Sequence, residues 1–255
     1  MPGSSVFPLS MRIQLMIPCL VEDCLPEIGL AVVSVLERLG VGVDHPQGQT
    51  CCGQLAWKTG DVKNARALAL RSLDLFDGPD AVVCPSGSCT RMLRTYPELF
   101  QPGSSGHARA LDLAGRSFEF CEFLALLPGA PDFGAALTAR AALHRSCQLD
   151  GSDAPARLLA AVRGLTLLEP ERPDRCCGFG GLFSLQFPGV SESLLEDKAH
   201  ELLALDADIL VSAEPSCLLN ISGYLARLGR LAGPGRALHV AQVLDLGLSG
   251  GSSWA

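Results

Sequence analysis

The chain has 255 residues, 48% of them hydrophobic, and its net formal charge of −7, without any basic block, argues against a nucleic-acid partner. The longest apolar stretches, such as 28–36, are shorter than the roughly 20 residues that span a bilayer, so we expect no direct membrane insertion. The first ten residues lack the basic and apolar regions of a secretory signal, which predicts a cytoplasmic protein.

The first half of the chain alternates between predicted strands and helices. Apolar residues at positions 28, 32, 36 and 39 follow helical spacing, and Gly40 ends that helix. The expected strands are 12–17, 41–43 and 81–84, and the expected helices are 26–39, 61–76 and 90–96. Alternation of this kind is typical of parallel sheets with right-handed crossovers.

The second half repeats this pattern after a linker at 128–134. Its apolar run 139–144, strands 165–168 and 208–211 and helices 154–163 and 191–205 follow in the same order. We therefore predict an α/β protein of two tandem repeats, 11–127 and 135–246, each a small parallel-sheet unit, related by pseudo-two-fold symmetry. The halves are expected to face each other, each with its own cysteine-lined cleft.

Eight of the eleven cysteines fall into register between the halves, at offsets of 128, 125, 125 and 128 residues. They are Cys19, Cys51, Cys52 and Cys89 in the first half, and Cys147, Cys176, Cys177 and Cys217 in the second. Disulfides are disfavoured in a reducing cytosol, so a cysteine set of this kind indicates metal binding.

Four thiolates per half suit either a structural zinc ion or an iron–sulfur cluster. Adjacent cysteines reach different irons of a [4Fe-4S] cluster more easily than they reach one zinc ion, so we predict one or two such clusters per chain. Zinc remains the alternative. Gly53 and Gly178, which follow the two Cys-Cys pairs, are expected to let backbone N–H groups point at sulfide or thiolate.

Several stretches carry a family resemblance, among them CLVEDC at 19–24, VVCPSGSCTRMLRTYPELF at 82–100 and CCGFGGLFS at 176–184. They resemble the Cys-Cys-Gly domain of heterodisulfide reductases and of glycolate oxidase iron–sulfur subunits, and most of all the lactate utilization protein A group. The resemblance implies an iron–sulfur electron-transfer subunit of a complex that oxidises L-lactate to pyruvate. It also implies two partners, a ferredoxin-like iron–sulfur subunit and a third small subunit.

Two alternatives stay open at this point. The complex could act on glycolate or on a disulfide, since the substrate follows from the resemblance alone. A zinc-stabilised scaffold without redox activity is the alternative from another class. The sequence contains no flavin or nicotinamide motif, so catalytic residues are unassigned and the chain is not expected to catalyse lactate oxidation alone.

The fuller family motif ends each unit in C-x-x-C, whereas this chain has Ser86 and Glu214 at the first of those positions. The departure puts a five-thiolate cluster in doubt, and Glu214 is expected to be a solvated loop carboxylate. His144 is expected to be a satisfied strand-end histidine rather than a ligand. Of the other cysteines, Cys24 is expected to be a spare thiol, and Cys84 and Cys121 to be core residues.

Overall fold

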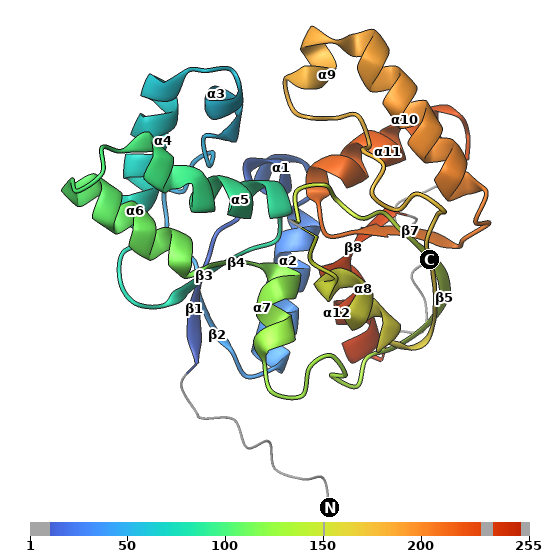
Figure 1. The fold of residues 1–255 in the computed structure, drawn as a ribbon. Coiled ribbons are helices and arrows are strands. Elements are labelled where there is room, and N and C mark those ends of the chain that lie inside the picture. The colour runs from blue at the N-terminus through green and yellow to red at the C-terminus, as the bar shows by residue number, and fades with distance from the viewer. Residues whose placement is uncertain (1–10, 150, 231–236, 251–255) are drawn as a thin grey trace, which may run out of the picture.

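The computed structural model describes residues 11–149, 151–230 and 237–250, which form two four-stranded parallel sheets with helices around them (Figure 1). The predicted α/β class with tandem parallel-sheet units is therefore confirmed. The residue bounds 11–127 and 135–246 stay a prediction. The leader at 1–10, on which we based the expected absence of a secretory signal, lies outside the described residues.

Both sheets have the same strand order. The first runs β2-β1-β3-β4 and the second β6-β5-β7-β8. Their strands are β1 Arg12–Leu15, β2 Gly42–Asp44, β3 Ala81–Cys84, β4 Ser117–Glu119, β5 Ala136–Leu143, β6 Arg163–Leu168, β7 Ile209–Ser212 and β8 Ala237–His239. The register repeats as well, because Leu15 lies opposite Val83 and Leu143 lies opposite Val211.

The helices of the first unit are α1 Cys19–Cys24, α2 Pro26–Arg38, α3 Gln54–Lys58, α4 Val62–Leu75, α5 Gly87–Thr95, α6 Ser105–Gly115 and α7 Phe120–Leu126, with a 3-10 turn at Tyr96–Leu99. Those of the second unit are α8 Ala154–Ala160, α9 Phe183–Gln186, α10 Pro188–Leu203, α11 Pro215–Arg227 and α12 Val240–Leu248. Every predicted strand and helix is present within a few residues. The elements that were not predicted include the last strand of each sheet and α6.

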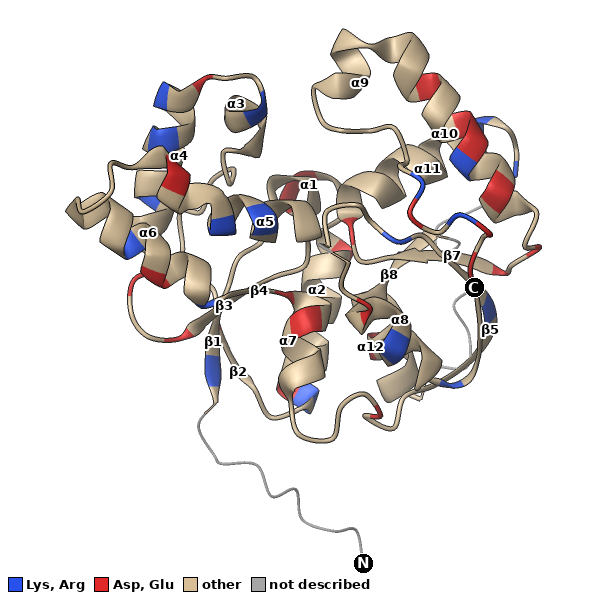
Figure 2. Ribbon diagram, in the orientation of Figure 1, with Lys and Arg blue, Asp and Glu red and all other residues tan. Residues whose placement is uncertain are grey.

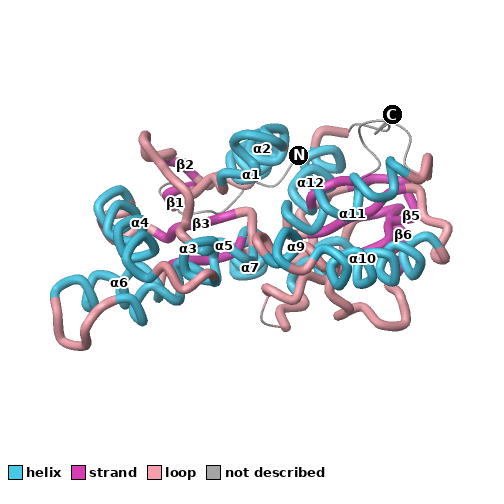
Figure 3. The backbone as a smooth tube through the Cα atoms, turned by 90° about the horizontal axis from the view of Figure 1, so that it is seen from above, coloured by secondary structure: helices cyan, strands magenta, loops and turns pink. Residues whose placement is uncertain are grey.

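A shared apolar core joins the two units. Helices α2 and α12 pack against each other, and one buried cluster includes Val32 and Val35 of α2 together with Val243 and Leu244 of α12. Figure 3 shows the two sheets side by side, each between helices. Because burial of apolar surface is the main stabilising term in folding, this core holds the two units in one arrangement.

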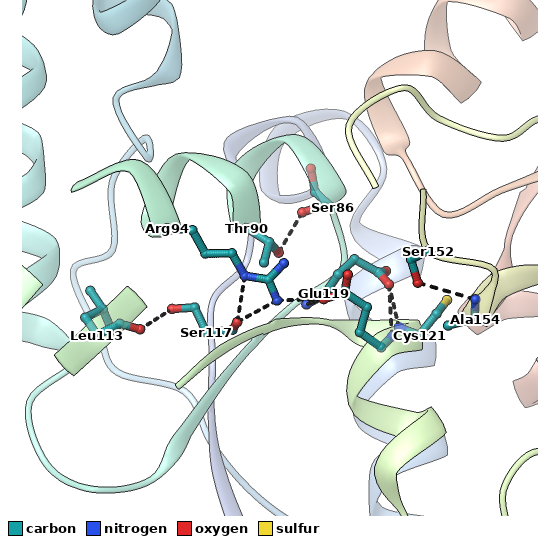
Figure 4. A network of polar contacts seen from close by, with 10 residues as sticks. Ser86, Thr90, Arg94, Leu113, Ser117, Glu119, Cys121, Ser152 and Ala154 are labelled. Atoms are coloured by element: carbon teal, nitrogen blue, oxygen red, sulfur yellow. Dashed lines mark hydrogen bonds and ion pairs between the residues drawn. The ribbon is translucent and has the colours of Figure 1, made fainter. Parts of the chain in front are cut away.

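Polar contacts position α5, the helix that carries Cys89. Arg94 donates to the carbonyl of Ser117 at 2.9 Å and to the carboxylate of Glu122 at 2.7 Å, which ties α5 to β4 and α7 (Figure 4). Thr90 bonds back to the carbonyl of Ser86 at the start of the same helix. The Arg94 contacts thus hold the later turns of α5 against β4 and α7.

Figure 2 shows charged residues on many helices and on the loops between elements, whereas α9 carries none. Among the residues that the structure describes, no helix combines the length and the apolar character needed to cross a bilayer.

Candidate functional site

The repeat cysteines lie beyond the carboxyl ends of the parallel strands. Cys19 and Cys89 follow β1 and β3, and Cys147 and Cys217 follow β5 and β7. In each sheet the strand order reverses between these two strands, and open α/β sheets bind their ligands at such a switch point. The fold therefore brings three separate loops of each unit to one place.

The burial of the cysteines repeats position for position. The first cysteine of each unit is exposed, the second half-buried, and the third and fourth are buried. In chain order these are Cys19, Cys51, Cys52 and Cys89 in one unit and Cys147, Cys176, Cys177 and Cys217 in the other. The duplication predicted from the spacing thus extends to the environment of each thiol.

The third and fourth thiols of each unit are in contact, and this contact is the same in the two units. The Sγ atoms of Cys52 and Cys89 are 3.4 Å apart, and those of Cys177 and Cys217 are 3.1 Å apart. Cys51 accepts hydrogen bonds from the thiols of Cys19 and Cys52, which lowers its pKa well below the ordinary value of 9.0. All eight are free thiols.

This donor set fits a thiolate-bound metal centre. The four thiols of each group are free, and two of the four are buried. Metals displace the protons of such thiols, and soft thiolate ligands suit iron–sulfur clusters and zinc. The chemistry of the donors therefore supports metal binding, whereas the choice between iron and zinc does not follow from it.

The two glycines after the Cys-Cys pairs donate backbone hydrogen bonds to cysteine sulfur. The N–H of Gly53 donates to Cys51 Sγ at 3.4 Å, and the N–H of Gly178 donates to Cys176 Sγ at 3.3 Å. Both glycines have positive φ angles, +87° and +80°. A Cβ at Gly178 would overlap the carbonyl oxygen of Ser191 on α10, so the missing side chain allows close approach of a helix as well.

A single cavity of about 360 Å³ is lined by all eight repeat cysteines. The expectation of a separate cleft in each half is therefore wrong. The physical reason is the shared core, which fixes the two switch points against each other. Lys58 and Glu214 are the charged residues of the lining, and the rest is mostly apolar.

Several supporting residues were missed by sequence reasoning. Tyr96 donates to the carbonyl of Cys52 at 2.9 Å, and Asn220 donates to the carbonyl of Cys177 at 2.9 Å. Lys198 is fully buried and donates to the carbonyls of Arg172 and Pro173, just before the second Cys-Cys pair. Helical spacing predicts only that such residues lie on helices. It does not predict the backbone carbonyls to which their side chains donate hydrogen bonds.

Glu214 is not the solvated loop carboxylate that we expected. It is 1% exposed and accepts hydrogen bonds from the hydroxyl of Ser86 and from the N–H of Ser88 at 2.8 Å. The cause is the packing of the two units, which places this second-unit side chain against the first-unit loop. Desolvation and the nearby Cys89 raise the pKa of Glu214.

His144 also differs from its expected description as a satisfied histidine. It is 1% exposed, and neither ring nitrogen has a hydrogen-bond partner. Burial, with the charge of Lys198, lowers its pKa to about 3, so the imidazole is neutral at pH 7. Its nearest nitrogen and the Sγ atoms of Cys177 and Cys217 all lie within 4.8 Å of one another.

The remaining cysteines lie as expected. Cys24 is exposed at the end of α1, while Cys84 and Cys121 are fully buried. Burial raises the pKa of both buried thiols. Cys84 also contacts Cys89, so it borders the first cysteine group without lining the cavity.

Comparison with known proteins agrees with the repeated cysteine groups. A cysteine-rich domain family, with the short name CCG, matches residues 13–94 and again residues 141–222. The chain is thus a tandem cysteine-rich-domain protein, with one thiol group in each domain.

Relatives that match over nearly the whole chain identify a narrower family than the domain match does. The chain is 41% identical to lactate utilization protein A of Geobacillus kaustophilus and 39% identical to that of Bacillus subtilis, over 92% of this chain and 99% of each relative. It belongs to the lactate utilization protein A family.

One solved structure is similar in fold, that of a hypothetical protein from Helicobacter pylori, with a TM-score of 0.59 and 10% identity. The similarity covers 93% of this chain, which spans about half the length of that protein.

Proposed function

We propose that this chain is an iron–sulfur electron-transfer subunit of a complex that oxidises L-lactate to pyruvate in the cytoplasm. The observation that carries the proposal is the convergence of two free-thiol groups on one cavity. The substrate follows from the names of the relatives, which are lactate utilization proteins. When bound, a [4Fe-4S] cluster would supply one-electron transfer.

The residues of this chain would act as ligands and as a surrounding shell. In each unit the repeat thiols would bind the cluster. The first group includes the adjacent pair Cys51 and Cys52, and the second includes Cys176 and Cys177. Gly53 and Gly178 would donate backbone hydrogen bonds to the half-buried thiolates, as they do to the thiols. Hydrogen bonds to sulfur and restricted solvent access both tune the reduction potential of a cluster.

The partners in this proposal are a ferredoxin-like iron–sulfur subunit and a third small subunit. They would dock at the mouth of the cavity. There Leu185 of α9 lines the cavity and is 75% exposed, and the neighbouring Phe187 is 55% exposed. Helix α9 carries no charged residue (Figure 2), and exposed apolar patches of this kind mark interaction surfaces.

The test is metal and sulfide analysis after anaerobic reconstitution. We expect iron and acid-labile sulfide in similar amounts, with about half of both lost in C51A/C52A and about half in C176A/C177A. The exposed Cys24 lies outside the cavity lining, so C24A is the matched control and should keep its full content.

Zinc without sulfide would contradict the iron–sulfur proposal and favour the scaffold alternative. Loss of all iron in either double variant would point to one cluster shared by the two groups. Reduction of the clusters by glycolate instead of lactate, or reoxidation of the reduced clusters by a disulfide substrate, in the assembled complex would overturn the proposed substrate.

A further inference from the structure

The two cysteine groups differ at one buried position beside the thiols. His144 directly follows strand β5, and its N–H donates to the carbonyl of Val211 at 2.8 Å. The equivalent residue of the first unit is Met16, whose N–H donates to the carbonyl of Val83 at 2.9 Å. Both are 1% exposed, so the fold places an imidazole where the other unit has a thioether.

The imidazole makes no hydrogen bond that would hold the fold together. Both of its ring nitrogens are buried without a hydrogen-bond partner, although buried polar groups are paired in the great majority of cases. Two thiols lie close to the ring, since one of its nitrogens is within 4.8 Å of both Cys177 and Cys217 Sγ. Among the residues that the structure describes, His144, Cys177 and Cys217 form the one group of three metal-binding side chains this close together.

We propose that His144 is a nitrogen ligand of the metal centre held by the second cysteine group, together with Cys177 and Cys217. The inference rests on the proposed function only in requiring that this group holds a metal. A [4Fe-4S] cluster has four terminal ligand positions, so in the second unit the imidazole would take the place of one of the other two thiols, Cys147 or Cys176, whereas the first unit offers four thiols alone. Imidazole is a common ligand of both iron and zinc.

The consequence is that the two centres are chemically different. A neutral imidazole donates to a metal without adding negative charge, unlike a thiolate, and histidine ligation changes the potential of iron–sulfur centres. The asymmetry would give the two ends of the shared cavity different affinities for an electron.

The experiment is pulsed EPR on the reduced, cluster-loaded full chain. We expect a strong coupling to histidine nitrogen, which changes with the isotope when histidine is labelled with ¹⁵N. His144→Met, which copies the first unit, should abolish the coupling. The control is H200M, because His200 is exposed on α10, and it should keep the coupling.

Absence of histidine nitrogen coupling in the labelled wild-type protein would overturn the proposal, and so would its persistence in H144M. If H144M does not load, H144Q provides the second variant, and the labelled wild-type sample still decides whether histidine is bound. If the protein binds zinc rather than iron, the iron–sulfur proposal is wrong, but the proposed role of His144 as a metal ligand is still open to test. Cobalt(II)-substituted protein then reports the nitrogen coupling, with loss in H144M expected and retention overturning the role of His144.

Discussion

Ser86 and Glu214 occupy the same position in the two repeats, 128 residues apart, and they are hydrogen-bonded to each other, with Ser86 Oγ at 3.1 Å from Glu214 Oε2. Each is the N-cap of the helix that carries the last cysteine of its unit, α5 or α11. The pseudo-symmetry thus brings two equivalent helix starts together between the two thiol groups, and the contact couples the two units at the cavity wall.

Removal of the Glu214 side chain should therefore destabilise the protein. In E214A the N–H of Ser88 and the hydroxyls of Ser86 and Ser216 lose a buried acceptor, and unsatisfied buried donors cost about 1–3 kcal/mol each. We expect the free energy of unfolding, from urea denaturation of the reduced protein, to fall by about 2–4 kcal/mol.

The matched control is E192A, since Glu192 is an exposed glutamate of α10 that pairs with Arg227. An exposed ion pair contributes about 0–1 kcal/mol, so this variant should unfold close to wild type. Equal stability of E214A and E192A would show that the contact between the units contributes little.

Alanine should be tolerated less at Gly178 than at Gly53. Both positions have positive φ, which costs a residue with a Cβ about 1–2 kcal/mol. At Gly53 the new Cβ meets Leu68 at an ordinary 3.4 Å, whereas at Gly178 it would overlap the carbonyl of Ser191. G178A should lose about 1–3 kcal/mol more than G53A in urea denaturation. Equal losses would mean that α10 shifts away from a Cβ at position 178 with little cost in stability.

Glu119 should make stability fall as the pH rises. Its carboxylate is buried, caps α7 by accepting from the N–H of Cys121 at 2.8 Å (Figure 4), and desolvation raises its pKa from 4.5 to about 8. Between these values only the folded protein holds the proton, so unfolding releases it and higher pH favours the unfolded state.

The corresponding loss is roughly 1.4 kcal/mol per pH unit over this window, or about 3–5 kcal/mol in all. E119Q keeps an acceptor for the cap without a titrating group, so its free energy of unfolding should depend less on pH from 5 to 8. Parallel pH profiles of wild type and E119Q would contradict this assignment.

The apolar rim of the cavity should bind a partner subunit. L185D places a charge at the rim, and we expect retention of the co-expressed subunits to fall roughly tenfold, or about 1.4 kcal/mol, with unchanged iron content. Leu30 on α2 is similarly exposed, at 72% against 75% for Leu185, and does not line the cavity, which makes L30D the control. Equal retention by both variants would place the interface elsewhere.

The isolated chain should not oxidise lactate at a useful rate. Removing two electrons and two protons from the alcohol carbon requires an acceptor placed against it, and the sequence has no flavin or nicotinamide motif. Lactate-dependent dye reduction should appear only when the co-expressed subunits are present. Full turnover by the cluster-loaded chain alone would mean that the cavity itself is a substrate site.

The duplication, the alternation of strands and helices and the pairing of each Cys-Cys with a glycine could all be predicted from the sequence, because these features depend on spacing along one chain. Cys52 and Cys89 could be assigned to one group for the same reason, since parallel strands bring their loops to a common edge. The last strand of each sheet was not predicted, because it is only three residues long and a helix follows it directly.

The relation between the two cysteine groups depends instead on how the units pack. The contact of α2 with α12 sets the distance between the sheets, and it made one cavity out of two expected clefts. The same packing buried Glu214 against Ser86, while the folding of the second unit placed His144 beside two thiols without a hydrogen-bond partner. Such relations join residues that are far apart in the chain, and the burial that sets the state of a carboxylate or an imidazole comes from neighbours that no local pattern specifies.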